Sequence, residues 1–125
     1  MPYRLSWENN VLHIRLTGDV TLENIREYEN LIWSDPRFDR LDYVLWDGSH
    51  IDSLELPVEE AEFSAAYSKA SSLSNASIKV AMVVTDPDMQ SLVEAYVAFL
   101  EYVDTPWTLK VFDSIDPAKE WLLQP

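Results

Sequence analysis

Two segments near the start of the chain, Tyr3–Trp7 and Val11–Thr17, alternate between apolar and polar side chains. This period of two is typical of β-strands that bury one face. The Glu-Asn-Asn sequence at residues 8–10 has the composition of a turn, so the two segments predict a β-hairpin. Gly18 and Asp19 interrupt the alternation and predict the end of the second strand.

Two later segments, Leu41–Trp46 and Ile78–Val84, are apolar on both faces along most of their length. Strands of this kind are covered on both sides, as in parallel sheets. We therefore expect them in the middle of the sheet, with the alternating strands nearer the edges. Trp107–Phe112 predicts a last strand.

Helix start and stop signals separate these strands. Thr21 predicts an N-cap that is followed by an apolar stripe at helical spacing, and Pro36 predicts where this helix ends. Pro57 and the two glutamates that follow it predict a second helix, which runs to about Leu73. The serine-rich segment after it predicts a loop.

Two further helices begin with an aspartate followed by a proline. The pair Asp86-Pro87 predicts a long helix to about Val103, and the pair Asp116-Pro117 predicts a short one that ends near Leu123. The predicted order of elements is therefore ββαβαβαβα. Strands that alternate with helices imply right-handed crossovers and a mostly parallel sheet.

This order predicts an α/β fold, with a mixed, mostly parallel sheet of about five strands and about four helices. The sequence contains no linker, repeat or low-complexity segment, and its length of 125 residues suits one unit. We therefore expect residues 1–125 to form a single domain.

The charge of the chain limits its partners. It carries 22 acidic and 9 basic side chains, which gives a formal net charge of −13. Such a surface repels nucleic acid, which is therefore not an expected partner. No apolar run approaches the roughly 18 residues of a membrane span, and no signal-peptide pattern is present. Together with the absence of cysteine, these features predict a cytoplasmic protein without a membrane span.

Residues that could carry cofactor or metal chemistry are few. His13 and His50 lie far apart and outside any metal-ligand motif, so no metal site is expected. Gly18 and Gly48 are the only glycines, which excludes a glycine-rich phosphate loop. The sequence therefore predicts no cofactor.

Catalytic chemistry is also not expected. A Ser-His-Asp triad can be assembled only from residues that are nearly adjacent in sequence, namely Ser49 or Ser53, His50, and Asp47 or Asp52. Neighbouring residues rarely point the same way, and no Gly-x-Ser-x-Gly elbow is present. These polar residues gather where a strand ends, which is also where open α/β folds place ligands.

The predicted helix Met89–Val103 is apolar around most of its circumference. A surface helix normally shows one apolar stripe and a polar opposite face. The excess of apolar surface fits a core helix, a face for self-association, or one wall of an apolar ligand pocket. Candidate contact or ligand residues come from this helix and from the strand end: Trp46, Asp47, Ser49, His50, Asp52, Ser53, Tyr96, Phe99, Leu100 and Val103.

Beyond these local patterns, the order of elements resembles the SpoIIAA-like family of STAS domains, named after the sporulation anti-anti-sigma factor. The strings that carry the resemblance are Leu16–Asn24, Leu41–Asp47, Ile78–Val84, Trp107–Asp113 and Ala118–Leu122. They cover nearly the whole chain and are specific for architecture rather than for activity. The resemblance implies a mixed sheet with helices packed on it and no enzyme activity.

The resemblance also implies a switch segment after the third strand. Regulatory STAS domains carry an Asp-Ser-Ser-Gly-type sequence there, and a kinase that is itself the anti-sigma factor phosphorylates the second serine. In this chain Asp52 and Ser53 match the first two positions. Leu54 stands in place of the phosphorylated serine, and Glu55 in place of the glycine. The residue that would be switched is therefore missing.

Three functions remain open from the sequence. The first is a non-catalytic, self-associating interaction module, a homodimer or a binder of another protein, that uses the apolar helix. The second is a carrier or sensor of a small apolar, lipid-like ligand, because the subgroup is similar in fold to CRAL-TRIO lipid carriers. The third is a phosphorylation-switched anti-sigma-factor antagonist that uses Ser49 or Ser53. The sequence favours the first over the second, and both over the third.

Overall fold

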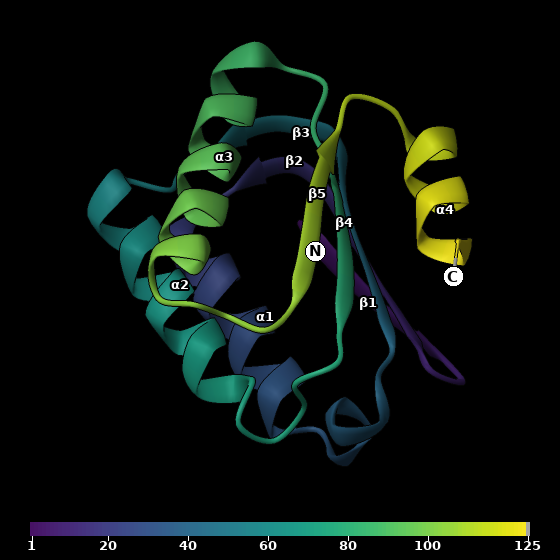
Figure 1. Cartoon of the computed structure of the whole chain (residues 1–125). Helices are drawn as coiled ribbons and strands as arrows, with labels where there is room; N and C mark the ends of the chain where they lie inside the picture. The colour runs from purple at the N-terminus through teal and green to yellow at the C-terminus, as the bar shows by residue number, and fades with distance from the viewer. Residues whose placement is uncertain (125) are drawn as a thin grey trace.

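A computed structural model describes residues 1–124, which form one five-stranded sheet with helices on both faces (Figure 1). The strands, in their order across the sheet, are β1 Tyr3–Glu8, β2 Val11–Val20, β3 Tyr43–Leu54, β4 Lys79–Val83 and β5 Thr108–Phe112. Strands β1 and β2 are antiparallel, and the remaining pairs are parallel. The predicted fold class is confirmed, and the doubly apolar β3 lies in the middle of the sheet.

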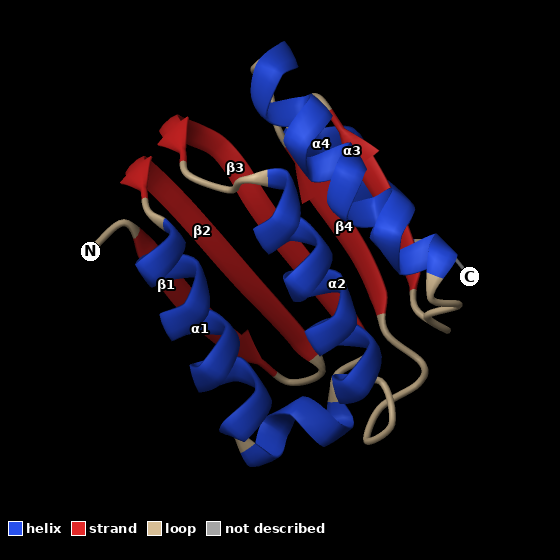
Figure 2. Cartoon of the chain, turned by 90° about the vertical axis from the view of Figure 1, so that its left-hand side faces the viewer, coloured by secondary structure: helices blue, strands red, loops and turns tan. Residues whose placement is uncertain are grey.

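The helices divide unequally between the two faces of the sheet (Figures 1 and 2). They are α1 Leu22–Ser34, the 3-10 helix η1 Pro36–Arg40, α2 Val58–Ser71, α3 Pro87–Tyr102 and α4 Ile115–Leu123. Helices α1, α2 and α3 cover one face, which we call the front face and which includes Val44, Trp46, Val80 and Met82. Helix α4 lies on the opposite, back face, which includes Leu45, Ala81 and Val83.

The helix starts follow the local sequence closely. Thr21 caps α1 through a capping box, in which its side chain and that of Asn24 accept from each other's backbone N–H groups. Asp86 caps α3 by accepting from the two N–H groups that follow Pro87. Helix α4 begins one residue before Asp116, so the predicted cap is wrong and the aspartate lies in the first turn.

Strands β2 and β3 are longer than the sequence pattern predicts. Two register shifts, between Arg15 and Thr17 and between Gly18 and Asp19, allow β2 to continue to Val20. The φ angle of Gly18 is +68°, which glycine adopts without strain, so this glycine forms an irregularity within the strand rather than its end. The predicted end of the strand at Gly18 is therefore wrong.

Strand β3 likewise does not end at Asp47. Beyond the Asp47–Val83 pair, where β4 stops, β3 continues to pair with β2 as far as Leu54. The predicted strand exit at residues 47–50 is therefore wrong, because the bulged end of β2 provides β3 with a partner that alternation does not reveal. Residues 48–54 belong to a two-stranded ribbon at the carboxyl end of the sheet.

Gly48 lets β3 pass closely over its neighbours. A β-carbon at this position would lie 2.7 Å from the Trp46 ring and 2.8 Å from the backbone oxygen of Val83. Both distances are shorter than a carbon atom tolerates, so a larger residue would have to displace the ring or the adjacent strand.

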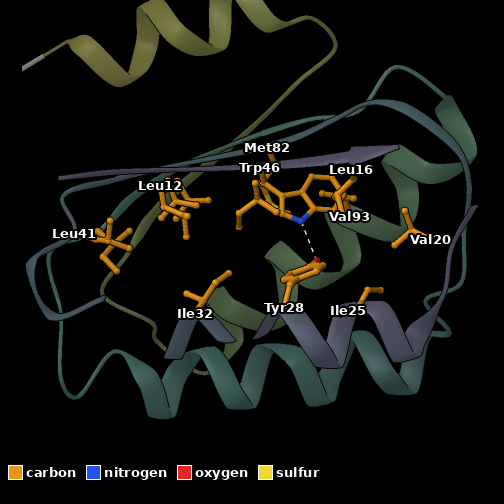
Figure 3. Packing of buried hydrophobic residues seen from close by; sticks show 14 of the residues in the cluster. Leu12, Leu16, Val20, Ile25, Tyr28, Ile32, Leu41, Trp46, Met82 and Val93 are labelled. Carbon is orange, nitrogen blue, oxygen red and sulfur yellow. Dashed lines mark hydrogen bonds between the residues drawn. The ribbon is translucent and has the colours of Figure 1, made fainter. Parts of the chain in front are cut away.

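The core consists of two clusters, one on each face of the sheet. The front cluster is the larger and joins the sheet to α1 and α3, with Leu12, Ile25 and Trp46 among its members (Figure 3). The back cluster is small and joins β3 and β4 to α4 through Ala81 and Ala118, both of which are fully buried. Among residues 1–124, no helix combines the length and apolar character needed to cross a membrane.

Candidate functional site

An apolar cavity of about 110 Å³ lies within the front layer, between the sheet and helices α1, α2 and α3. Its sheet side includes Ile14, Trp46 and Val80, and its helix side includes Ile25 and Val93. Protein interiors normally contain few voids larger than a water molecule, so a space of this size in the main core is a candidate binding site.

Tyr28 of α1 points into the front layer and meets Trp46 of β3 (Figure 3). The indole Nε1–H of Trp46 donates to the Tyr28 hydroxyl oxygen over 3.0 Å. Burial raises the pKa of the Tyr28 hydroxyl far above its usual range. The hydroxyl therefore stays neutral and keeps its proton at physiological pH.

Tyr96 of α3 meets Ser68 of α2 on another wall of the cavity. The Ser68 hydroxyl donates to the backbone oxygen of Ser64 over 2.9 Å. The Tyr96 and Ser68 hydroxyls lie 2.8 Å apart, and either of them can be the donor in this contact. Burial raises the pKa of the Tyr96 hydroxyl as well.

A charged network joins α1 to α2 beside the cavity. Arg26 donates to Glu29 over 2.7 Å, to the Ser64 hydroxyl over 2.8 Å and to Glu60 over 2.6 Å. Burial raises the pKa of Glu29, although Arg26 acts in the opposite direction. Both Glu29 and Ser64 line the cavity, so its wall includes a buried carboxyl group that depends on one arginine for compensation.

Aromatic side chains form a second link between the same two helices. The rings of Trp33 and Tyr67 stack with centroids 4.3 Å apart, and Tyr67 meets Phe63 edge to face. Arg26 lies over the Phe63 ring at 4.7 Å. The contacts between α1 and α2 therefore include one guanidinium group and one stacked aromatic pair.

The polar residues expected at the end of β3 lie mainly on the back face. Asp47 is only 3% exposed and accepts from the backbone N–H and the hydroxyl of Ser49, at 3.1 and 2.6 Å. The Nε2 atom of His13 lies 3.6 Å from the second carboxylate oxygen. Burial opposes ionisation of Asp47, but the hydrogen bonds from Ser49 and the nearby His13 outweigh it and lower the pKa.

This cluster contains the residue types of a triad but not its connectivity. The Ser49 hydroxyl gives its proton to Asp47, so in its 3.0 Å contact with Nδ1 of His50 the histidine is the donor. A nucleophilic serine needs the reverse arrangement, in which histidine accepts the proton. Within the part of the chain that the structure describes, no three potential ligand side chains are grouped to hold a metal ion.

The segment that matches the STAS switch lies in the ribbon of β2 and β3. The Ser53 hydroxyl donates to Asp19 of β2 over 2.7 Å. Leu54 is the last residue of β3, and Glu55 accepts from the backbone N–H of Leu22 at the start of α1. Asp52 is exposed beside them. The segment is thus part of the sheet and of a helix cap.

The structure separates five of the predicted site residues into two groups. Trp46 and Tyr96 line the front cavity, whereas Asp47, Ser49 and His50 form the hydrogen-bonded cluster behind them. Three others lie on α3 or at its C-cap and do not line the cavity: Leu100 is buried, and Phe99 and Val103 are half-buried.

Several cavity residues were missed by sequence reasoning. The apolar stripe of α1 could accommodate either Tyr28 or Glu29, and both prove to be buried and to line the cavity. The signal on α2 is a buried row of small residues at helical spacing, Ala61, Ser64, Ala65 and Ser68. Small side chains on a face that points at a sheet leave space, and this row could have indicated the cavity.

Comparison with known proteins identifies relatives of this fold. A family model described as SpoIIAA-like matches residues 11–123. The solved structure of the anti-sigma factor antagonist SpoIIAA in its unphosphorylated form superposes with a TM-score of 0.59 at 11% identity, covering 94% of each chain. An uncharacterized protein with a SpoIIAA-like fold from Shewanella loihica gives 0.52 at 17% identity, covering 96% of this chain and 91% of that one.

None of the curated proteins is similar enough to this chain to count as a match. The two structural likenesses are at low sequence identity and establish the fold alone. The family model, however, spans both central strands and every helix of the described chain. The chain therefore belongs to the SpoIIAA-like family.

Proposed function

We propose that this protein is a non-catalytic SpoIIAA-like STAS module that senses or carries a compact apolar ligand in its front cavity. The observation that carries this proposal is the cavity of about 110 Å³ in the main core. Empty space in a core removes packing contacts, and cavities of this kind destabilise a protein unless something fills them. Both Trp46 and Tyr96, two of the predicted site residues, line this space.

The volume limits the size of the ligand. An apolar cavity of about 150 Å³ takes up one benzene molecule. The front cavity is smaller, at about 110 Å³, so in its present shape it holds a molecule of the size of a short branched alcohol or a small ring. A long lipid chain would require α1 and α2 to separate. We therefore favour a small sensed molecule over a transported lipid.

Native mass spectrometry of freshly purified protein tests this proposal. We expect an adduct that is lost after organic extraction. The double variant Val80→Ile, Val93→Leu adds apolar volume to two cavity-lining positions and should carry less of the adduct. A clean mass in both proteins, together with no spectral change on addition of small apolar molecules, would contradict the proposal.

Self-association is a second candidate function, supported by Tyr102 at the end of α3. Its side chain is 86% exposed, which is unusual for a large aromatic residue. The rest of the helix supports this function less, because Val93 and Leu100 are buried in the monomer. Light scattering after size exclusion should show a dimer that Tyr102→Ser converts to a monomer. A monomer at high concentration would count against this function.

A phosphorylation-switched anti-sigma-factor antagonist is the third and least favoured candidate. The fold is compatible with it, but the exposed Ser53 lies against Asp19 and beside Asp52. A phosphate group at Ser53 would add negative charge next to these carboxylates, which repel it. Phosphate mapping of protein expressed with its host kinases tests this reading, and unmodified Ser49 and Ser53 would count against it.

A further inference from the structure

Tyr28 has a hydroxyl proton that no described residue accepts. Its oxygen already accepts from the Trp46 indole N–H at 3.0 Å. Its own O–H group makes no hydrogen bond to any atom of residues 1–124 within the usual distance limit. The side chain is 7% exposed and lines the cavity. The cavity wall thus presents a hydrogen-bond donor.

Tyr96 presents the complementary group. Its hydroxyl contacts Ser68 at 2.8 Å, and either group can be the donor. Because a phenol oxygen has two lone pairs, at least one lone pair of Tyr96 is left over in both cases. A second wall of the same cavity therefore presents a hydrogen-bond acceptor.

We propose that the cavity binds a compact neutral alcohol, whose hydroxyl group accepts from Tyr28 and donates to Tyr96. This inference rests on the proposed ligand-binding function and adds the chemical class of the ligand. A hydroxyl is the smallest group that offers both an acceptor and a donor. The apolar remainder of the ligand would lie against side chains such as Ile14, Ile25 and Val80.

The charges around the cavity favour a neutral ligand. Glu29 contributes a buried carboxyl group to the wall, and the chain as a whole carries a net charge of −13. A carboxylate ligand would be repelled by both and would lose its hydration on entry. The nearby guanidinium group of Arg26 is already engaged by Glu29 and Glu60. An ammonium group could meet Glu29, but it could not accept from Tyr28.

Cyclobutanol and cyclobutanone are suitable probes because both are smaller than benzene and share the same ring, and only the alcohol carries a hydroxyl proton. Both accept from Tyr28, but only the alcohol donates to Tyr96. Titration of the ¹⁵N-labelled protein, followed by NMR, measures both affinities. The indole N–H of Trp46 is bonded directly to the Tyr28 oxygen and serves as an internal reporter. We expect the alcohol to bind about tenfold more tightly than the ketone.

Three tyrosine-to-phenylalanine variants separate the two hydrogen bonds. Tyr28→Phe should weaken the binding of both probes about tenfold. Tyr96→Phe should weaken the binding of the alcohol alone, so that alcohol and ketone then bind with equal affinity. Tyr102→Phe is the matched control, because this tyrosine lies on the same helix as Tyr96 but is 86% exposed. It should change neither affinity. Well-dispersed spectra confirm that each variant is folded.

The outcomes distinguish this inference from the proposed function. If alcohol and ketone bind equally and neither Tyr28→Phe nor Tyr96→Phe affects them, the cavity takes apolar ligands but the hydroxyl assignment is overturned. If neither probe shifts the Trp46 resonance, the tyrosines meet only water, and both the inference and the ligand-binding function are overturned. If the alcohol binds more tightly than the ketone and Tyr96→Phe removes this difference in affinity, the inference is supported.

Discussion

The two faces of the sheet differ in how many helices cover them and in what their cores contain. The front face is covered by α1, α2 and α3, and its core contains a cavity, two buried tyrosine hydroxyls and a buried carboxyl group. The back face is covered only in part, by α4, and none of the residues in its cluster lines the cavity. Fully buried Ala81 and Ala118 let the helix approach the strands closely. The larger layer is thus the looser one.

The buried carboxyl groups on the two faces also differ, in the direction of their pKa shifts. On the front face, Glu29 lies beside the cavity and its pKa is raised by burial. On the back face, Asp47 is equally hidden, but its pKa is lowered because Ser49 and His13 stabilise the charged form. The surroundings of Asp47 on the back face therefore stabilise its charged form, whereas burial on the front face disfavours the charged form of Glu29.

Removal of Arg26 should produce the largest effect on stability. Arg26→Ala leaves the Glu29 carboxylate buried without its partner and breaks the link from α1 to α2. We expect a loss of about 2–3 kcal/mol in the free energy of unfolding at neutral pH, measured with urea. Adding Glu29→Gln should recover about 1 kcal/mol, because it removes the unpaired charge.

The matched control is Arg37→Ala. This arginine also pairs with a carboxylate, Asp35, and also lies over an aromatic ring, but its side chain is 52% exposed. Exposed pairs contribute little, so we expect a much smaller loss than for Arg26→Ala. Equal losses for Arg26→Ala and Arg37→Ala would mean that Glu29 is not effectively buried.

The pH dependence of two charge-removing variants should have opposite signs. The pKa of Asp47 is lowered from 3.8, so its stabilising effect is present above that value and is lost as the pH falls through the folded-state pKa. Asp47→Asn should therefore cost about 1–2 kcal/mol at neutral pH, and the deficit should close in acid.

The pKa of Glu29 is raised from 4.5, so the native protein gains stability as the pH falls through the folded-state value. The stability of Glu29→Gln relative to the native protein should therefore be greater at neutral pH than in acid. Urea unfolding of both variants across the acidic range measures the two slopes. Slopes of the same sign would contradict the contrast between the faces.

Two valines on β4 offer the mildest test of packing. Val80 lines the front cavity, whereas Val83 is fully buried in the back cluster. Val83→Ile should destabilise by about 1 kcal/mol, because the added methylene has no space to fill. Val80→Ile should be neutral or slightly stabilising, since it extends into the cavity. Comparable losses at both positions would show that the front layer is packed as tightly as the back.

Much of this fold follows from local patterns. The cap at Thr21, the stop at Pro36 and the start at Asp86 are confirmed, because each depends on a few neighbouring residues. The ends of β2 and β3 were predicted wrongly because each strand provides the other's partner through a bulge at Gly18. Such a pairing is a property of two distant segments and leaves no periodic signal in either of them.

The candidate site was only partly predictable for a similar reason. Trp46 and Tyr96 were expected near a ligand, and both line the cavity. Tyr28 could be placed on an apolar stripe, but its unpaired proton follows from its contact with Trp46 in space. The division of Asp47 and Trp46 between two faces follows from strand alternation, yet the partner of Asp47, His13, comes from the adjacent strand.

A crystal of the protein held under xenon pressure tests the central claim most directly. Xenon enters apolar cavities and avoids well-packed cores. We predict one strong xenon position in the front layer, within contact of Trp46, Val80 and Val93, and none between α4 and the sheet. A front layer without xenon, or with ordered water in its place, would contradict the claim that this core is arranged to hold an apolar ligand.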